Sequence, residues 1–358
     1  MEAGKYIVLI LGAGASRQYD VPVMREFLPY ARRRYFQRKR NYHEDEILNC
    51  YSRLFEFYDE YRGSVWSLDR DWDNIEELYT QADLLKIMGT PDSADLCGLI
   101  AWAIWDMYRQ PIKIEDNNLA SICEKLPRDL IPVVITTNYD LVVEKALINK
   151  FFYPGLRIPD NPVIASDNVL LQAANPGLIP IIKLHGSVNW YSTSNGILAE
   201  LGGITEDEKA PLQNIRKNLV EAFARHGSRV IHPGIIPPTL GKHSEDDLIA
   251  LHWLSAVEAI SMARQIWVIG YSFPQTDTFM SRLLTEGLRR TDDLDFLGVV
   301  DVVPQEQHGI TSLLAKRMAA NKFVYSQGGA RPALTMMNRF PYDQWREVLK
   351  DLKPPSPN

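Results

Sequence analysis

Residues 131–140 read IPVVITTNYD, and the expected architecture of the chain is built around them. The segment begins as a short apolar run rich in valine and isoleucine, which predicts a β-strand, and it ends abruptly in polar residues. Strands of an open parallel sheet are buried on both faces, and ligands bind where their carboxyl ends emerge. We therefore expect Asn138 and Asp140 at such an end. Position alone favours Asn138 as the cap of the helix expected at residues 142–150.

A glycine-rich turn follows the first apolar run of the chain. Residues 6–11, YIVLIL, predict a β-strand that leads into GAGAS at residues 12–16. Glycines let backbone N–H groups approach a pyrophosphate closely, and the N-terminus of a following helix adds favourable partial charge. A glycine turn after the first strand of a doubly wound sheet can also be purely structural. The turn alone therefore leaves phosphate binding and a structural role equally open.

Three further apolar runs end in polar or glycine-containing segments. They are IPIIKLHGSVNW, QIWVIGYS and LDFLGVVDVV, at residues 179–190, 265–272 and 294–303. The residues of interest at these ends are His185, Gly270, Ser272 and Asp301. A histidine in this position either satisfies hydrogen bonds or titrates near neutral pH and acts as an acid or base on a sugar hydroxyl. An acidic residue at a late strand end either binds ribose hydroxyls or caps a helix.

From about Met24 to Arg128 the apolar spacing changes to three or four residues, which predicts a long, mostly helical insertion. Helices are expected at residues 27–40, 47–61, 74–88 and 94–110. The tryptophans of this segment are expected in a hydrophobic core rather than around a ligand; they are Trp66, Trp72, Trp102 and Trp105. Residues 32–40 combine six basic side chains with two aromatic ones. They predict a solvated helix face, with docking of a partner or of nucleic acid as the alternative.

The alternation of strands and helices predicts an α/β fold. We expect a Rossmann-like, doubly wound, mainly parallel sheet with helices on both faces and helical insertions. Residues 1–24 and 129–350 are expected to form one Rossmann-like domain, with a small polar and partly helical insertion at about 191–229. Residues 25–128 are expected to form the large helical insertion, and residues 351–358 a disordered, proline-rich tail.

Composition excludes several classes of protein. A chain of 358 residues with 46% hydrophobic content can bury a substantial core, and the formal net charge of -6 argues against a surface built throughout for nucleic acid or acidic membranes. The three cysteines are far apart and none lies in a CxxC pair, so neither a disulfide framework nor a cysteine zinc site is expected. The N-terminal apolar run is too short to span a membrane and lacks a cleavage pattern. We expect a cytoplasmic chain.

Taken together, five segments resemble those of the sirtuin, or SIR2-like, family in their order and strand context. They are GAGAS at 12–16, TTNYD at 136–140, KLHGSVNW at 183–190, HPGIIPPTLGK at 232–242 and GYSFP at 270–274. The resemblance covers the strand ends from Gly12 to about Asp301 and leaves both insertions outside. It implies a sirtuin-type NAD-binding fold.

The resemblance also implies roles for individual residues. Asn138 resembles the asparagine of the TQN-type motif, His185 the histidine of the HG motif and Ser272 the serine of the GTS-type turn. The implied catalytic residues are Asn138, His185 and Asp140. The implied NAD-binding residues are Gly12, Ala13, Gly14, Ser16, Thr137, Gly270, Ser272 and Asp301. Arg25 falls where sirtuins carry the arginine of a GIPDFR segment, but the residues before it depart from that pattern, so its role stays open.

Departures from the family pattern narrow the implied chemistry. Protein-deacylating sirtuins carry a four-cysteine zinc module after the histidine strand, whereas the sequence has no cysteine after Cys123 and no FGE-type acyl-lysine groove motif. The helical insertions resemble those of bacterial SIR2-like NAD hydrolases of anti-phage defence. The resemblance thus implies an NAD+ glycohydrolase that cleaves the nicotinamide–ribose bond, with NAD as substrate and without a metal. An NAD-dependent protein deacylase and a non-catalytic sensor of NAD or ADP-ribose are the alternatives.

The implied activity carries an expectation about partners. An NAD hydrolase that is always active would harm its host, so we expect gating by assembly or by a partner. A homo-oligomer, a HerA-like ATPase and an Argonaute-like protein all fit this role, and the basic helix at 32–40 is the expected docking surface. The trigger, and the choice between ADP-ribose and a cyclic product, stay open.

Overall fold

The structure is a computed structural model that describes most of the chain. The described residues are 6–41, 46–62, 75–90, 93–109, 112, 114, 118–148, 150–156, 178–194, 196–199, 221, 230–236, 247–274, 277–291, 294–310 and 323–352. Trp66, Trp72, most of the predicted insertion at 191–229 and residues 353–358 of the predicted tail lie outside them.

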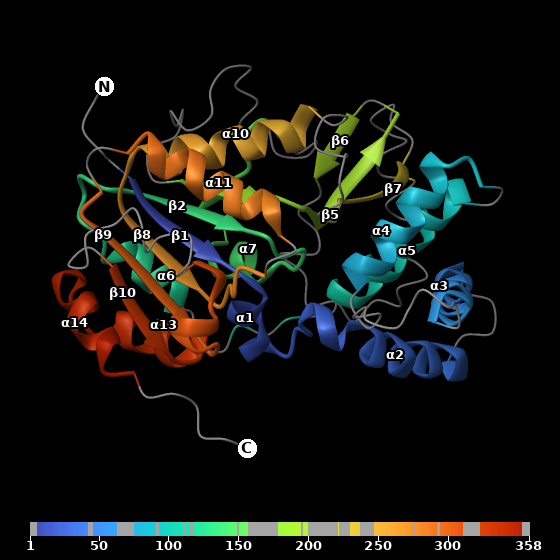
Figure 1. Cartoon of the computed structure of the whole chain (residues 1–358), viewed down its shortest axis with the longest axis horizontal. Coiled ribbons are helices and arrows are strands. Elements are labelled where there is room, and N and C mark those ends of the chain that lie inside the picture. The colour runs from blue at the N-terminus through green and yellow to red at the C-terminus, as the bar shows by residue number, and fades with distance from the viewer. Residues whose placement is uncertain are drawn as a thin grey trace.

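A seven-stranded sheet forms the centre of the molecule (Figure 1). In spatial order its strands are β10 (Phe323–Gln327), β9 (Phe296–Asp301), β8 (Ala263–Ile269), β1 (Tyr6–Leu11), β2 (Ile131–Thr136), β4 (Ile179–Lys183) and β3 (Phe151–Phe152). Every neighbouring pair is parallel. β1 lies between β2 and β8, so the order of strand addition reverses beside β1. The predicted doubly wound, mainly parallel sheet is confirmed.

Helices cover both faces of this sheet, and the side chains of β1 show why. Ile7, Leu9 and Leu11 enter one hydrophobic core, while the alternate residues enter the other, as the two-residue period of a strand requires. The helices α10 (Asp247–Ser261) and α11 (Thr278–Arg289) lie over one face (Figure 1). The other face carries α6 (Asn118–Glu124), α13 (Ala330–Arg339) and α14 (Trp345–Lys350).

The segment between β1 and β2 is helical, as predicted. Its long helices are α2 (Phe27–Asn41), α3 (Glu46–Arg62), α4 (Ile75–Ile87) and α5 (Ser93–Tyr108). Trp102 and Trp105 are buried in a third hydrophobic core, which confirms the prediction for these two residues. The same core contains Tyr139 and Val188 from the segments that follow β2 and β4, so the insertion packs directly on the strand ends.

Two basic side chains of α2 form ion pairs with a buried carboxylate inside the protein. Asp106 of α5 is fully buried, and its carboxylate accepts hydrogen bonds from Tyr51 at 2.8 Å and from Arg34 at 3.1 Å. Arg38 is also buried and pairs with the same carboxylate at 3.3 Å. A buried carboxylate needs such partners, so two of the six basic residues hold α2, α3 and α5 together. The solvated face predicted for residues 32–40 is therefore wrong at Arg38, which is buried, while Arg34 is half-buried.

The predicted strand at 179–190 is two strands in two sheets. β4 ends at Lys183, Leu184 and His185 form a turn, and β5 (Gly186–Thr193) leaves the main sheet. β5 lies between β6 (Gly196–Ala199) and β7 (Val230–Ile235) in a small antiparallel sheet. The turn needs Gly186, because its φ is +77° and a Cβ there would lie 1.9 Å from the Gly234 carbonyl oxygen. Gly196, which begins β6 with a φ of +101°, is the overlooked sequence signal for the β5–β6 hairpin.

The remaining elements are short helices. They are α1 (Ala13–Ser16), α7 (Val142–Ala146) and the 3-10 helices η1 (Arg17–Tyr19), η2 (Met24–Glu26), η5 (Gln305–Gln307) and η7 (Tyr342–Gln344). β10 and α13 were not predicted, because neither is long or uniformly apolar. Among the described helices, none combines the length and the apolar character that crossing a bilayer requires.

Candidate functional site

The carboxyl ends of four neighbouring strands meet at one edge of the main sheet. Leu11 of β1 lies beside Thr136 of β2 and Ile269 of β8, and Thr136 lies beside Lys183 of β4. The polar segments that follow these strands are consequently neighbours. In Figure 1 the arrowheads of β1 and β2 point toward the side where α4 and α5 lie. Asn138 and His185 both follow strands that end at this edge.

The glycine turn after β1 packs directly on the turn after β8. The N–H groups of Gly12 and Gly14 donate to the carbonyl oxygens of Ile269 and Gly270, at 3.1 and 2.9 Å. A Cβ on Gly12 would lie 2.5 Å from the Gly270 carbonyl oxygen, and Gly270 itself has a φ of +64°. Close backbone approach therefore explains the glycines without a ligand, so glycine content alone cannot distinguish the two roles considered for this turn.

Replacing Gly270 with alanine should cost at least about 2 kcal/mol of unfolding free energy, because the left-handed backbone is strained and the new Cβ would lie 2.4 Å from Ala15 N. Gly98→Ala is the matched control, since a Cβ at Gly98 of α5 meets nothing within 4 Å. That change should be neutral or stabilising by about 0.5 kcal/mol. Urea unfolding of both variants measures the difference, and equal midpoints would contradict the close packing of the two turns.

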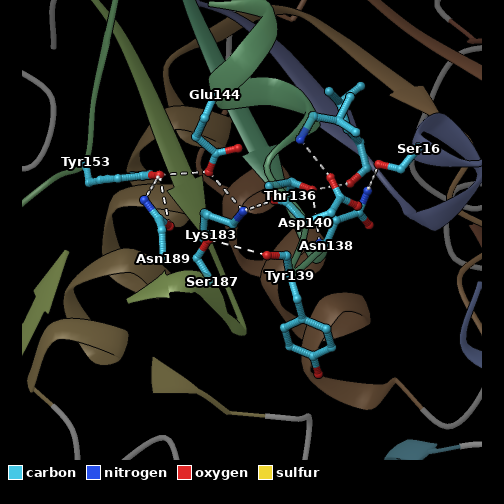
Figure 2. Close-up of polar contacts among 12 residues, drawn as sticks. Ser16, Thr136, Asn138, Tyr139, Asp140, Glu144, Tyr153, Lys183, Ser187 and Asn189 are labelled. Carbon is cyan, nitrogen blue, oxygen red and sulfur yellow. Dashed lines mark hydrogen bonds and ion pairs between the residues drawn. The ribbon is translucent and has the colours of Figure 1, made fainter. Parts of the chain in front are cut away.

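Asn138 joins the end of β2 to the glycine turn. Its side-chain nitrogen donates to the Gly12 carbonyl oxygen at 2.9 Å and to Ser16 Oγ at 3.0 Å (Figure 2). A carbonyl oxygen can only accept, so the amide nitrogen must face the turn. The side-chain oxygen then makes no hydrogen bond to any residue that the structure describes. Asn138 does not cap α7, whose first N–H group, that of Val142, is bound by Asp140 at 3.0 Å.

Asp140 is buried beside Asn138 and is connected to it through Ser16. Burial raises the pKa of the Asp140 carboxyl, while the charge of Lys183, the Val142 N–H group and a hydrogen bond with Ser16 act in the opposite direction. Ser16 thus accepts from Asn138 and donates to Asp140, because a carboxylate can only accept. The Ser16 hydroxyl thus connects the side chains of Asn138 and Asp140.

A buried ion pair lies under the same segment. Lys183 Nζ donates to the Asp140 carbonyl oxygen at 2.6 Å and to Glu144 Oε1 at 2.9 Å, and both charged side chains are fully buried (Figure 2). Tyr153 also donates to Glu144, at 2.8 Å, and is itself linked to Asn189. Neither Lys183 nor Glu144 was predicted to have a role. Nothing in their spacing reveals the pair, because they lie 39 positions apart.

His185 is in the turn between β4 and β5 and is almost fully buried. Its ring lies edge-on to Trp253 of α10, with 5.9 Å between the ring centroids. Its carbonyl oxygen accepts from Ile236 N, and the preceding Leu184 carbonyl oxygen accepts from Trp253 Nε1. The imidazole is therefore positioned by contacts on both sides of the turn rather than lying on a mobile surface.

The other predicted residues differ in accessibility. Ala13 lies in α1, Thr137 is half-buried, and Ser272 is exposed after β8. Asp301 is buried at the end of β9, where one carboxylate oxygen accepts from Val303 N at 2.9 Å and the other lies 4.0 Å from His308 Nε2. Burial raises the pKa of Asp301 and lowers that of His308. The side chain of Arg25 is outside the described part of the structure.

A cavity of about 320 Å³ lies beside this edge, on the side of the insertion. The segment between α1 and α2, α2 itself and the end of α5 enclose it, and its walls include Pro22, Arg33 and Tyr108. The Tyr108 ring also lies 6.0 Å from that of Tyr139, so one wall of the cavity is in contact with the TTNYD segment. Within the described residues, no group of three or more His, Cys, Asp or Glu side chains could hold a metal ion.

Residues 132–231 match the family model of the SIR2-like domain. The match begins in β2, ends in β7 and includes Asn138, Asp140 and His185, whereas the glycine turn and the ends of β8 and β9 lie outside it. A SIR2-like domain is consistent with an NAD-utilising enzyme.

Solved sirtuin structures resemble the chain at low identity. A Sir2 complex with the inhibitor EX-527, 2'-O-acetyl-ADP-ribose and a deacetylated p53 peptide is 14% identical, covering 97% of this chain and 95% of that one, with a TM-score of 0.40. Sir2Tm bound to a propionylated peptide is 15% identical, covering 94% and 92%, with a TM-score of 0.39. No curated protein matches the chain.

Proposed function

We propose that this protein is an NAD+ glycohydrolase, which cleaves the bond between nicotinamide and ribose with water as the acceptor. The observation that carries the proposal is the state of Asn138. Its amide nitrogen is held by the glycine turn, while its oxygen has no hydrogen bond to a described residue. An oriented acceptor at a strand-end edge suits a ribose hydroxyl or an attacking water.

The reaction needs few groups from the protein. Nicotinamide leaves as a neutral base when the C1'–N bond breaks and takes the bonding electrons, so the ribose develops oxocarbenium character. Water then adds to C1' and loses a proton, which gives ADP-ribose. The site must orient the ribose, stabilise positive charge and admit one water.

We assign the residues at the edge to this reaction as follows. Asn138 orients the ribose or the water, His185 contacts the ribose hydroxyls as a base or hydrogen-bond partner, and Asp140 orients these groups and offsets positive charge. The glycine turn, Gly12 to Gly14, and Ser16 hold the pyrophosphate. The adenosine side is assigned to Thr137, Gly270, Ser272 and Asp301. The scheme requires no metal.

His185→Gln should lower the rate of nicotinamide release from NAD+ by about 100-fold or more, because glutamine cannot act as a base near neutral pH. Chromatographic quantification of nicotinamide and ADP-ribose measures the effect and identifies the products. His232→Gln is the control, since His232 lies in β7 and its ring contacts the Pro233 carbonyl oxygen. Near-normal turnover by His185→Gln, with wild-type activity present, would remove His185 from the proposed chemistry.

We further propose that the activity is gated and belongs to bacterial anti-phage defence, where it would deplete NAD. Self-assembly, a HerA-like ATPase or an Argonaute-like protein would provide the gate, and the exposed basic residues of α2 would take part in docking. Comparing NAD turnover by the isolated chain with turnover in the presence of each candidate partner tests this. Nicotinamide release that depends on an acylated peptide would instead indicate a deacylase, and NAD binding without turnover under every condition a sensor.

A further inference from the structure

Among the described residues that line the cavity beside the strand-end edge, none is assigned to NAD+ hydrolysis. The cavity has a volume of about 320 Å³ and lies between α2, the end of α5 and the segment that joins α1 to α2 (Figure 1). Small-molecule sites span roughly 300–1,000 Å³, so this volume suits a ligand smaller than a dinucleotide. The cavity is therefore a candidate site for a second ligand, separate from NAD.

The wall that α2 contributes is positively charged. Arg33 and Arg34 both line the cavity, together with one acidic residue, Asp20. The Arg33 guanidinium lies over the Tyr30 ring, 4.2 Å from its centroid, and forms no ion pair with a described carboxylate. The buried Asp106 carboxylate accepts from Arg34 Nε at 3.1 Å and so fixes the direction of that side chain. Guanidinium groups bind phosphate with charge-assisted and often paired hydrogen bonds.

Much of the remaining lining is aromatic or apolar. Met107 and Tyr108 are buried at the end of α5, while the Tyr30 ring is exposed on α2. Surfaces of this kind bind a planar base by stacking. Gln37 adds an amide that can both donate and accept, as the edge of a base or a ribose hydroxyl requires. A planar base joined through a sugar to one phosphate matches this combination of groups.

We propose that this cavity binds a nucleoside monophosphate, with the phosphate on Arg33 and the base against the tyrosine rings, and that the bound nucleotide is an effector of the strand-end site. The binding site follows from the cavity alone, whereas the effector role rests on the proposed function.

Two walls of the cavity are in contact with the strand-end site. The Tyr108 ring packs against Tyr139 of the TTNYD segment, with 6.0 Å between the ring centroids. The segment after α1 is tied to the glycine turn, because Gln18 Nε2 donates to the Ala15 carbonyl oxygen at 3.2 Å. The Tyr108 hydroxyl also donates to Met24 Sδ at 3.8 Å, which joins the two walls. A bound nucleotide would touch both walls and so has a physical route to NAD+ binding.

Calorimetry on the full-length chain, with AMP, GMP, CMP and UMP as probes, tests the binding site. Wild type should bind at least one of them, and Arg33→Gln should raise its Kd by about tenfold or more, because the charged contact with phosphate is lost. Arg33→Lys should recover part of the loss. Arg32→Gln is the matched control and should keep the wild-type Kd, since Arg32 is exposed on the same helix, pairs with Asp59 at 3.4 Å and does not line the cavity.

Two smaller probes show which parts of the nucleotide are recognised. The matching nucleoside lacks the phosphate and inorganic phosphate lacks the base, so each should bind about tenfold more weakly than the nucleotide, or worse. Phosphate that binds as tightly as the nucleotide would overturn the nucleotide assignment. Absence of binding by all four nucleotides, or an unchanged Kd in Arg33→Gln, would overturn the site itself.

A competition experiment separates the cavity from the strand-end site, because AMP is also a part of NAD. In the presence of saturating ADP-ribose, wild type should still bind the nucleotide and Arg33→Gln should not. Nucleotide binding that ADP-ribose abolishes and that Arg33→Gln retains would place the nucleotide at the strand ends and overturn the inference.

Nicotinamide release tests the effector role by itself. A nucleotide concentration that fills the cavity should change the KM for NAD+ by about fivefold or more in wild type and leave it unchanged in Arg33→Gln, whose KM without nucleotide should equal that of wild type. An unchanged KM in wild type with nucleotide bound would overturn the effector role. Absence of nicotinamide release under every condition would reject the proposed function, while the calorimetry would still decide the binding site.

Discussion

Asn138→Ala is expected to abolish nicotinamide release from NAD+, with a loss of at least about 100-fold, because it removes a side chain that links the end of β2 to the glycine turn and presents an acceptor at the strand-end edge. Turnover by purified protein, assayed by chromatography of the products, measures the loss. The change also removes two hydrogen bonds from a buried amide, so the unfolding free energy should fall by about 1–3 kcal/mol.

A control must separate this loss of stability from loss of the reacting geometry. Asn118→Ala removes a comparable amide, since Asn118 is buried in α6 and accepts from Asn338 Nδ2 at 2.9 Å, between the helices on one face of the sheet. It should lower stability by a similar amount and keep NAD+ turnover. If Asn138→Ala retained turnover while folded, the central assignment of the proposed function would be wrong.

Lys183→Met is expected to cost about 3–5 kcal/mol of unfolding free energy, because it leaves the carboxylate of Glu144 buried without its cation. It also removes the donor to the Asp140 carbonyl oxygen, so the TTNYD segment should lose rigidity. Guanidinium unfolding at pH 7 measures the change. The double variant Lys183→Met with Glu144→Leu should recover most of the loss, since no uncompensated charge remains.

Lys150 provides the comparison for this experiment. It pairs with Glu124 at 2.5 Å, but both side chains are more than half exposed, and exposed pairs contribute about 0–1 kcal/mol. Lys150→Met should therefore change stability little. A loss in Lys183→Met no larger than that in Lys150→Met would show that the buried pair is not what holds the segment under the site.

The insertion and the sheet meet through specific polar contacts as well as through the hydrophobic core. Trp105 Nε1 of α5 donates to the Tyr191 hydroxyl of β5 at 3.0 Å, and Arg109 donates to the same oxygen. β5 begins next to His185, so the helices of the insertion are connected to the turn that carries His185. Movement of the insertion would then reach the site, which gives the proposed gating a physical route.

Local patterns were sufficient to predict the parallel sheet, the helical insertion and the edge at which the polar segments gather. A strand buried on both faces must be apolar along its whole length. The segments YIVLIL and IPVVIT can therefore be recognised as buried strands without knowledge of the strands beside them. In the helices of the insertion, apolar residues recur every three or four positions, and this spacing likewise predicts which face of each helix is buried. β5 and β10 lack such a signal, because one lies in a small side sheet and the other at the edge of the main sheet.

The partners of the polar side chains could not be predicted from the sequence, because these contacts join residues far apart in the chain. From the sequence, Asn138 is as compatible with helix capping as with a hydrogen bond to Gly12. In the folded chain the glycine turn lies beside Asn138, and the side chain bonds to the turn. Burial decides that Lys183 pairs with Glu144. Periodicity reports which face of an element is buried, whereas the pairing of charges and amides depends on how whole elements pack.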